Sequence, residues 1–211
     1  MKPFTYTAWN REVRRLHAAW ADIVLDPYVQ GDGPDSYTED AYGTLACALM
    51  TDGRTIARAF GRGGWEGCDS ADPYPDVWAM IEACADGACI QISDVNHNGA
   101  MLGNDSLNLL FRAHHDAVHV INAFGFNLAE ECEVAADTVE RLGLDVRTAA
   151  IVASEIIGQS LHVQCTDKFP LVDGRQPFTP ACAEIVAWAM DAFDTLCECS
   201  PFDPRKDGPS E

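Results

Sequence analysis

The segment 104–122 carries the side chains best suited to metal chemistry, including three of the six histidines of the chain. On an α-helix with about 3.6 residues per turn, histidines at i and i+4 direct two imidazoles toward one point, which is the spacing of helical metal sites. Asp116 flanks this pair as a second ligand or as an orienting group. The helix is otherwise apolar, so the alternative is a polar stripe that faces water. One narrow stripe carries Asn108, Arg112, His115 and His119.

Acidic side chains follow in a second predicted helix, 127–142. Glu130 lies opposite the apolar stripe of this helix, as is typical of a solvated face. Glu131 borders the apolar side and is the better ligand by periodicity. The choice between the two acids stays open.

A third predicted helix, 146–164, is apolar almost all round and places Glu155, Gln159 and His162 on one stripe. A carboxylate in such a helix needs a partner, because an unpaired buried charge is costly. A metal ion, Arg112 or a histidine would be a suitable partner for Glu155. The alternative is that the stripe is exposed to solvent and Glu155 needs no partner.

Together the three helices predict a mononuclear or dinuclear site for zinc, manganese or iron. The ligands would be His115, His119, Glu155 and one of Glu130 and Glu131. Such a metal polarises a substrate oxygen or lowers the pKa of a water molecule.

A small anionic substrate is the expected partner of this site. Arg112 is the expected anion receptor, because its planar fork matches carboxylate or phosphate. Asp116 at i+4 is the alternative, as an ion-pair partner that neutralises Arg112. Catalytic roles are assigned to Asp116 and Arg112, and the further substrate candidates are Asn108, Gln159 and His162.

Several of these motifs resemble those of a poorly characterised group of phage-encoded proteins. The matching stretches are LFRAHHDAVH (110–119), Gly125-Phe126, the acidic residues 130–133 and SEIIGQS (154–160). That group carries FRAVHD-xxGH-like, Gly-Glu and TE-xx-GQ-like motifs, and the similarity covers roughly residues 72–162. The resemblance implies a shared site and a phage or prophage origin, hence a bacterial host cytoplasm, and it supplies no reaction.

His115-Asp116 is also similar to the central pair of HD-type phosphohydrolases, which are helical metal enzymes that cleave phosphoesters and nucleotides. Those enzymes add an upstream histidine and a downstream aspartate. His17 or His97 would be the first of these, and Asp137 or Asp145 the second.

Charge and composition narrow the partners. The chain has 211 residues and a formal net charge of −19. Such a surface repels phosphate backbones and anionic lipid, which disfavours nucleic-acid and membrane binding, although a nucleic-acid mimic would be acidic too. The sequence has no apolar run long enough to span a membrane and no signal peptide, so a cytoplasmic location is expected. The nine cysteines form no CxxC pair and are expected to be reduced thiols.

Periodicity predicts a mainly α, helical-bundle-like single domain over residues 1–211, with a small β element. Residues 1–103 would hold N-terminal helices, a loop and the β element, 104–200 the helical core with the site, and 201–211 a frayed tail. The best strand candidate is 88–95, with 54–60 as a candidate partner and 61–76 as an ordered loop. The remaining predicted helices are 8–25, 38–50, 76–85, 105–123 and 180–198.

The favoured function is that of a metal-dependent enzyme, a hydrolase of a phosphorylated or nucleotide-like small molecule. One alternative is a ferritin-like helical oxidase with iron. Another is a non-enzymatic acidic phage protein that blocks a host partner and needs no metal.

Overall fold

Helices make up most of the residues that the computed structural model describes, which are 36–95, 105–160 and 163. This confirms the predicted mainly α chain with a small β element. The predicted helices 8–25 and 180–198 and the tail lie outside the described residues. The elements are α3 (Ser36–Thr51), α4 (Gly53–Phe60), β1 (Trp65–Cys68), α5 (Val77–Ala85), β2 (Ile90–Ser93), α6 (Asp105–Asn122), α7 (Leu128–Leu142), α8 (Val146–Ala153) and a π-helix, η1 (Ser154–Gly158).

The two strands form a parallel sheet in which Trp65 pairs with Ile90 and Cys68 with Ser93. Helix α5 connects them, and the Asp76 side chain caps its first turn by accepting a hydrogen bond from the Ala79 amide. Ile90 and Ile92 alternate along β2 and are fully buried, which is the period-2 pattern that predicted this strand.

The prediction that residues 54–60 are the partner strand is wrong. They form helix α4, because the buried Ile56 and Phe60 are spaced i, i+4 and line one helical face. The partner β1 instead lies inside 61–76, which was predicted to be loop throughout. Its sequence gives little strand signal because it contains Gly67, where a Cβ would lie 3.1 Å from Leu109 Cδ2 and would require that side chain to shift.

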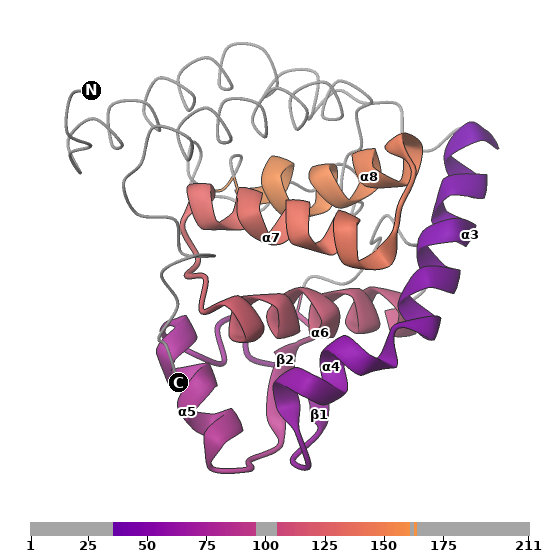
Figure 1. Cartoon of the computed structure of the whole chain (residues 1–211). Helices are drawn as coiled ribbons and strands as arrows, with labels where there is room; N and C mark the ends of the chain where they lie inside the picture. Colours follow the sequence, from indigo (N-terminus) through magenta and orange to yellow (C-terminus); the bar gives the residue numbers. More distant parts are fainter. Residues whose placement is uncertain (1–35, 96–104, 161–162, 164–211) are drawn as a thin grey trace, which may run out of the picture.

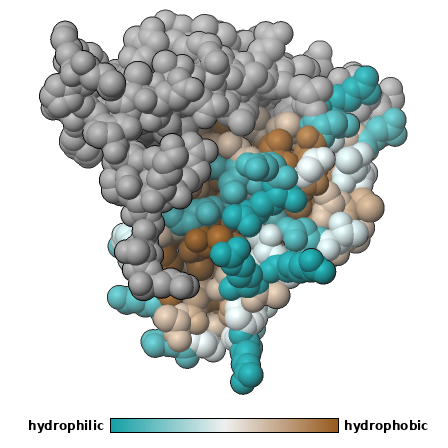
Figure 2. Space-filling model, in the orientation of Figure 1, coloured by the Kyte–Doolittle hydropathy of each residue, from teal (hydrophilic) through white to brown (hydrophobic). Residues whose placement is uncertain are grey.

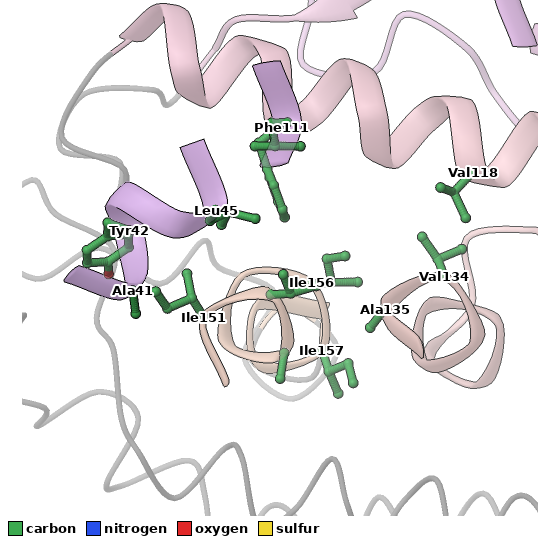
Figure 3. Packing of buried hydrophobic residues seen from close by; sticks show 13 residues of the cluster. Ala41, Tyr42, Leu45, Phe111, Val118, Val134, Ala135, Ile151, Ile156 and Ile157 are labelled. Atoms are coloured by element: carbon green, nitrogen blue, oxygen red, sulfur yellow. The ribbon is translucent and has the colours of Figure 1, made fainter. Parts of the chain in front are cut away.

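Helix α6 is the central element, and it packs against α3, α4, α5, α7 and β2 (Figure 1). On one side, Phe111 and Val118 join the core of α3, α7, α8 and η1, where Figure 3 shows Leu45, Ile151, Ile156 and Val134 around them. On the other side, a second core contacts α6 through Ala113 and Ala117, and its larger members are Ile56, Phe60, Met80, Ile90 and Ile92.

Burial from both sides covers much of the polar stripe on α6. Asn108 is 3% exposed and His119 is 0% exposed, whereas Arg112 and His115 are half-buried. Asn108 and His119 therefore contact protein atoms rather than bulk water, and the stripe as a whole is not a solvated face. The hydrophilic surface of Figure 2 instead runs over α7, whose acidic face was expected to be solvated.

Helices α6 and α7 end in the same type of turn. After α6, the Phe124 amide donates to His119 O (3.1 Å) and the Ala123 amide to Val120 O (3.4 Å). After α7, Leu144 and Gly143 repeat this pattern at 3.1 Å each. This is the Schellman motif, which needs a left-handed residue just after the helix. Glycine fills that place in α7, with φ 62°, and alanine in α6, with φ 53°.

Among the described residues, no helix combines the length and apolar character that crossing a membrane requires.

Candidate metal centre

Three ligand atoms converge where the C-terminal half of α6 meets the first turn of α7. His115 Nε2 lies 2.7 Å from His119 Nε2 and 3.0 Å from Glu131 Oε2, and His119 Nε2 lies 3.5 Å from the same oxygen. Bonds of about 2.0–2.2 Å to one ion set neighbouring ligand atoms about 2.8–3.6 Å apart, from octahedral to tetrahedral geometry, so the two imidazole nitrogens at 2.7 Å would separate slightly on binding. His115, His119 and Glu131 could therefore hold a metal ion, and their ligand atoms all lie within 4.8 Å of one another.

The site is buried on one side and borders solvent on the other. The side chains of His119 and Glu131 are 0% and 8% exposed, whereas that of His115 is 22% exposed. The Phe126 ring meets the His119 ring edge-on, with centroids 5.0 Å apart, and Phe126 is itself exposed. His115 and Phe126 are therefore the members of this group that border solvent.

The three converging atoms, His115 Nε2, His119 Nε2 and Glu131 Oε2, have more lone pairs than protons to share between them. His119 Nδ1 lies 3.0 Å from the backbone oxygen of Phe124, which can only accept, so this nitrogen carries the proton. A neutral His119 then turns a lone pair at Nε2 toward His115 and Glu131. The one proton on His115 Nε2 cannot satisfy both neighbours, and a shared cation would satisfy all three atoms.

Charge interactions within the site shift two pKa values in opposite directions. Burial raises the pKa of Glu131, but the charges and hydrogen bonds of His115 and His119 outweigh burial and bring it down to about 2. Burial lowers the pKa of His115, but the charge and hydrogen bond of Glu131, with the charge of Asp116, outweigh it and raise the pKa above 6.5. Without metal, each of His115 and Glu131 therefore stabilises the charged form of the other.

Metal affinity is expected to rise with pH. A metal ion must displace the proton of His115, whose pKa is raised, so binding releases a proton until the pH exceeds that pKa. Competition for Zn²⁺ with a chromophoric chelator, from about pH 5.5 to about pH 8.5, measures this dependence. An affinity that does not change with pH, once corrected for the chelator, would exclude His115 as a ligand.

Asp116 lies beside the converging atoms without joining them. Burial raises its pKa, and the positive charges of His115 and His119 oppose that rise. The side chain is only half-buried. The HD-type motif would use His115 and Asp116 together as ligands, whereas the described ligand atoms that converge come from the two histidines and Glu131.

The structure assigns different positions to the two candidate acids of α7. Glu131 lies with the histidines, whereas Glu130 belongs to the cap at the start of α7. Its amide donates to Asn127 Oδ1 (3.1 Å), and the Asn127 side-chain amide donates to its carboxylate. Asn127 therefore caps α7 through its side chain, and the Glu130 carboxylate binds that side chain rather than the backbone amide that a capping box would use. Gly125 leaves room for this carboxylate, because a Cβ there would lie 2.8 Å from Glu130 Oε2.

Glu155 also lies apart from the converging atoms. It is 5% exposed within η1, and its charge acts on Arg112 and on the buried Tyr42, where it adds to the effect of burial in raising the tyrosine pKa. Its helix is π-helical over Ser154–Gly158, and Gln159, which follows directly, is half-buried. His162 lies outside the described residues.

Arg112 fastens α6 to the end of the sheet. Its Nη1 donates to the backbone oxygens of Ser93 and Val95, both at 2.8 Å. Burial lowers its pKa, and the carboxylates of Glu155, Asp116 and Asp94 counter that lowering. The guanidinium of Arg112 therefore already binds two carbonyls and lies among carboxylates, which disfavours the binding of an anion there.

Arg112→Lys is expected to reduce the free energy of unfolding by about 1–3 kcal/mol, because the lysine side chain is one bond shorter and does not bring its ammonium to the two carbonyls that Nη1 reaches. Urea denaturation of the two proteins measures the loss. Unchanged stability together with a loss of phosphate binding by calorimetry would contradict the structural role and favour the anion receptor.

Other polar residues of the region have structural partners. His114 Nε2 contacts Asp52 Oδ2 at 3.2 Å, which ties α6 to the start of α4. Asp137 accepts hydrogen bonds from the side chains of Asn122 and Arg141, and Asp145 caps α8 by accepting from the Thr148 amide. His17 and His97, the upstream candidates of the HD-type motif, lie outside the described residues.

The sequence-based set of site residues missed two contributors. The Phe124 carbonyl holds His119 through a backbone atom, which residue type cannot reveal. The Phe126 ring belongs to the Gly125-Phe126 pair, which was noted only as part of a resemblance and not as a neighbour of a histidine.

Comparison with known proteins adds no relative: no protein-family model, curated protein or solved structure matches the chain.

Proposed function

We propose that this protein is a metal-dependent hydrolase with one divalent ion, zinc, manganese or iron, bound by His115, His119 and Glu131. The observation that carries the proposal is the convergence of two imidazole nitrogens and one carboxylate oxygen at 2.7–3.5 Å. Two histidines and one carboxylate leave coordination positions for water and substrate, as in catalytic rather than structural sites.

The metal would supply a water molecule of lowered pKa and would polarise a substrate oxygen. Asp116 is the proposed general base. A carboxylate one residue after the first of two histidines spaced i, i+4 is where helical metal sites place this group. Burial raises the pKa of Asp116, which makes the carboxylate a better proton acceptor than an exposed one.

Phe126 and the exposed part of His115 would border the bound substrate. A phosphorylated or nucleotide-like small molecule is part of the proposal, together with a phage or prophage origin. Its support is the similarity to phage proteins and to HD-type enzymes. The hydrogen bonds of Arg112 to Ser93 and Val95 reduce the support that Arg112 gives to an anionic substrate.

An iron-dependent oxidase is a second candidate function, favoured by the same donor set. Two histidines and one carboxylate on a single face also bind iron in oxygen-activating enzymes. Two of the three separations, 2.7 and 3.0 Å, are close to the edge of about 3.0 Å that an octahedral face has at such bond lengths, whereas the third, 3.5 Å, is close to a tetrahedral edge.

Elemental analysis of protein purified without a histidine tag tests the proposal. We expect about one equivalent of a transition metal, which is lost in Glu131→Ala. Zinc or manganese would support hydrolysis, and iron with visible absorption bands would support the oxidase. A metal-free protein that also fails to bind added Zn²⁺, Mn²⁺ or Fe²⁺ would overturn both and leave the binding protein that blocks a host partner.

A further inference from the structure

Ala123, directly after α6, has an unusual backbone conformation. Its φ is 53°, and it is the only non-glycine residue with a positive φ among the described residues. An L-residue with a Cβ pays about 1–2 kcal/mol to adopt this conformation, and such outliers gather at functional sites. The corresponding position after α7, with the same hydrogen-bonding pattern, is Gly143.

The turn at Ala123 connects the end of α6 to one of the candidate ligands. The amide of Phe124 donates to the backbone oxygen of His119 at 3.1 Å, and the carbonyl of Phe124 accepts from Nδ1 of the same histidine at 3.0 Å. Phe124 therefore holds His119 at both its backbone and its ring. Both hydrogen bonds depend on the sharp reversal of the chain that a residue in the left-handed conformation provides.

We propose that the turn at Ala123 is a positioning element of the metal centre, which fixes the Nδ1–H tautomer of His119 and aims its Nε2 at the ion. The inference rests on the proposed metal centre, but not on the reaction. A metal-ligating histidine commonly donates its other ring N–H to a carbonyl, and loss of such a partner costs about 10–100-fold in metal affinity. The equivalent turn after α7 has no histidine to hold.

The pair Ala123→Val and Gly143→Val gives a matched test. A β-branched residue is strongly disfavoured at positive φ, so both variants should melt below wild type when metal-free. Only Ala123→Val should also lose metal affinity, by about 10–100-fold, in a competition assay with Zn²⁺ and a chelator. Equal losses in both variants, or none in Ala123→Val, would overturn the positioning role.

Two further measurements keep the proposal testable if Ala123→Val does not fold. Ala123→Gly keeps the left-handed turn and should bind Zn²⁺ within about threefold of wild type. Nitrogen-15 NMR of the metal-free wild type, at a pH where His119 is neutral, should show the proton on Nδ1. A proton on Nε2 would overturn the inference even if the protein binds metal, whereas a wild type without Zn²⁺ affinity would overturn the metal centre itself.

Discussion

Asp116→Asn is expected to lower the rate of metal-dependent hydrolysis by about 10²–10⁴-fold, the usual contribution of a general base. Asparagine keeps the shape of the side chain but cannot accept a proton from water. Metal affinity should change by only a few fold, because Asp116 does not belong to the converging ligand atoms. Turnover of a panel of nitrophenyl phosphates, nitrophenyl esters and nucleotides, with the zinc content measured in parallel, checks the result.

The pH profile adds a readout that a structural role would not change. A base must be deprotonated, so kcat/KM should fall as the pH drops through the raised pKa of Asp116, and Asp116→Asn should lack this limb. Asp137→Asn is the matched control, because Asp137 bonds Asn122 and Arg141 instead of bordering the site. Full activity in Asp116→Asn would contradict the assignment of the base.

Metal loading is expected to raise the melting temperature by about 5–10 °C when free metal is 100-fold above its Kd. An ion that binds only the folded state adds about 2.7 kcal/mol at that ratio, and 1 kcal/mol shifts the melting of a chain of this size by about 2–4 °C. Calorimetry of metal-loaded and chelated protein measures this difference in melting temperature. His119→Ala should abolish the difference, because it removes a ligand.

The adjacent acids of α7 provide the control for this effect. Glu131→Gln removes the anionic ligand with little change of shape and should erase the difference between the loaded and chelated samples. Glu130→Gln affects only the cap of α7, so it should keep the full difference and cost about 0.5–1 kcal/mol at most in both states. A metal-dependent shift that survives in Glu131→Gln, or disappears in Glu130→Gln, would show that the wrong acid has been assigned.

The metal-free protein should lose stability in acid because of the interaction between His115 and Glu131. The pKa of Glu131 is lowered from 4.5 to about 2 in the folded protein, so its contribution is complete above about pH 4.5 and is lost as the pH falls toward 2. The pKa of His115 is raised, so its contribution is complete below pH 6.5 and is lost as the pH rises through its folded value. The metal-free pair therefore stabilises the fold most between these limits.

Side-chain periodicity predicted the parts of the site that lie on regular helix. His115 and His119 share a stripe because α6 is an uninterrupted α-helix, and the border position of Glu131 on α7 gave it preference over Glu130. The same argument put Glu155 on a stripe that is indeed buried, but it could not place Glu155 relative to His115, because periodicity specifies a face of one helix and not how that helix packs against another.

Features that depend on the backbone or on tertiary packing could not be predicted in this way. The strand β1 contains Gly67, whose role appears only when Leu109 packs over it. The carbonyl that holds His119 comes from a turn whose left-handed residue is alanine, where the usual sequence signal is glycine. Arg112 had the right chemistry for an anion, and its bonds to Ser93 and Val95 depend on how the sheet lies against α6.

The described ligands are close along the chain, with His115 and Glu131 only 16 residues apart. Closing so short a loop costs little chain entropy. The segment from α6 to the start of α7 can therefore bind an ion before α3 packs against α6. Two consequences follow for folding. Metal should speed refolding by joining these helices early, and any affinity of the unfolded segment for the ion subtracts from the stabilisation seen at equilibrium. The rise in melting temperature would then understate how tightly the native protein holds its ion.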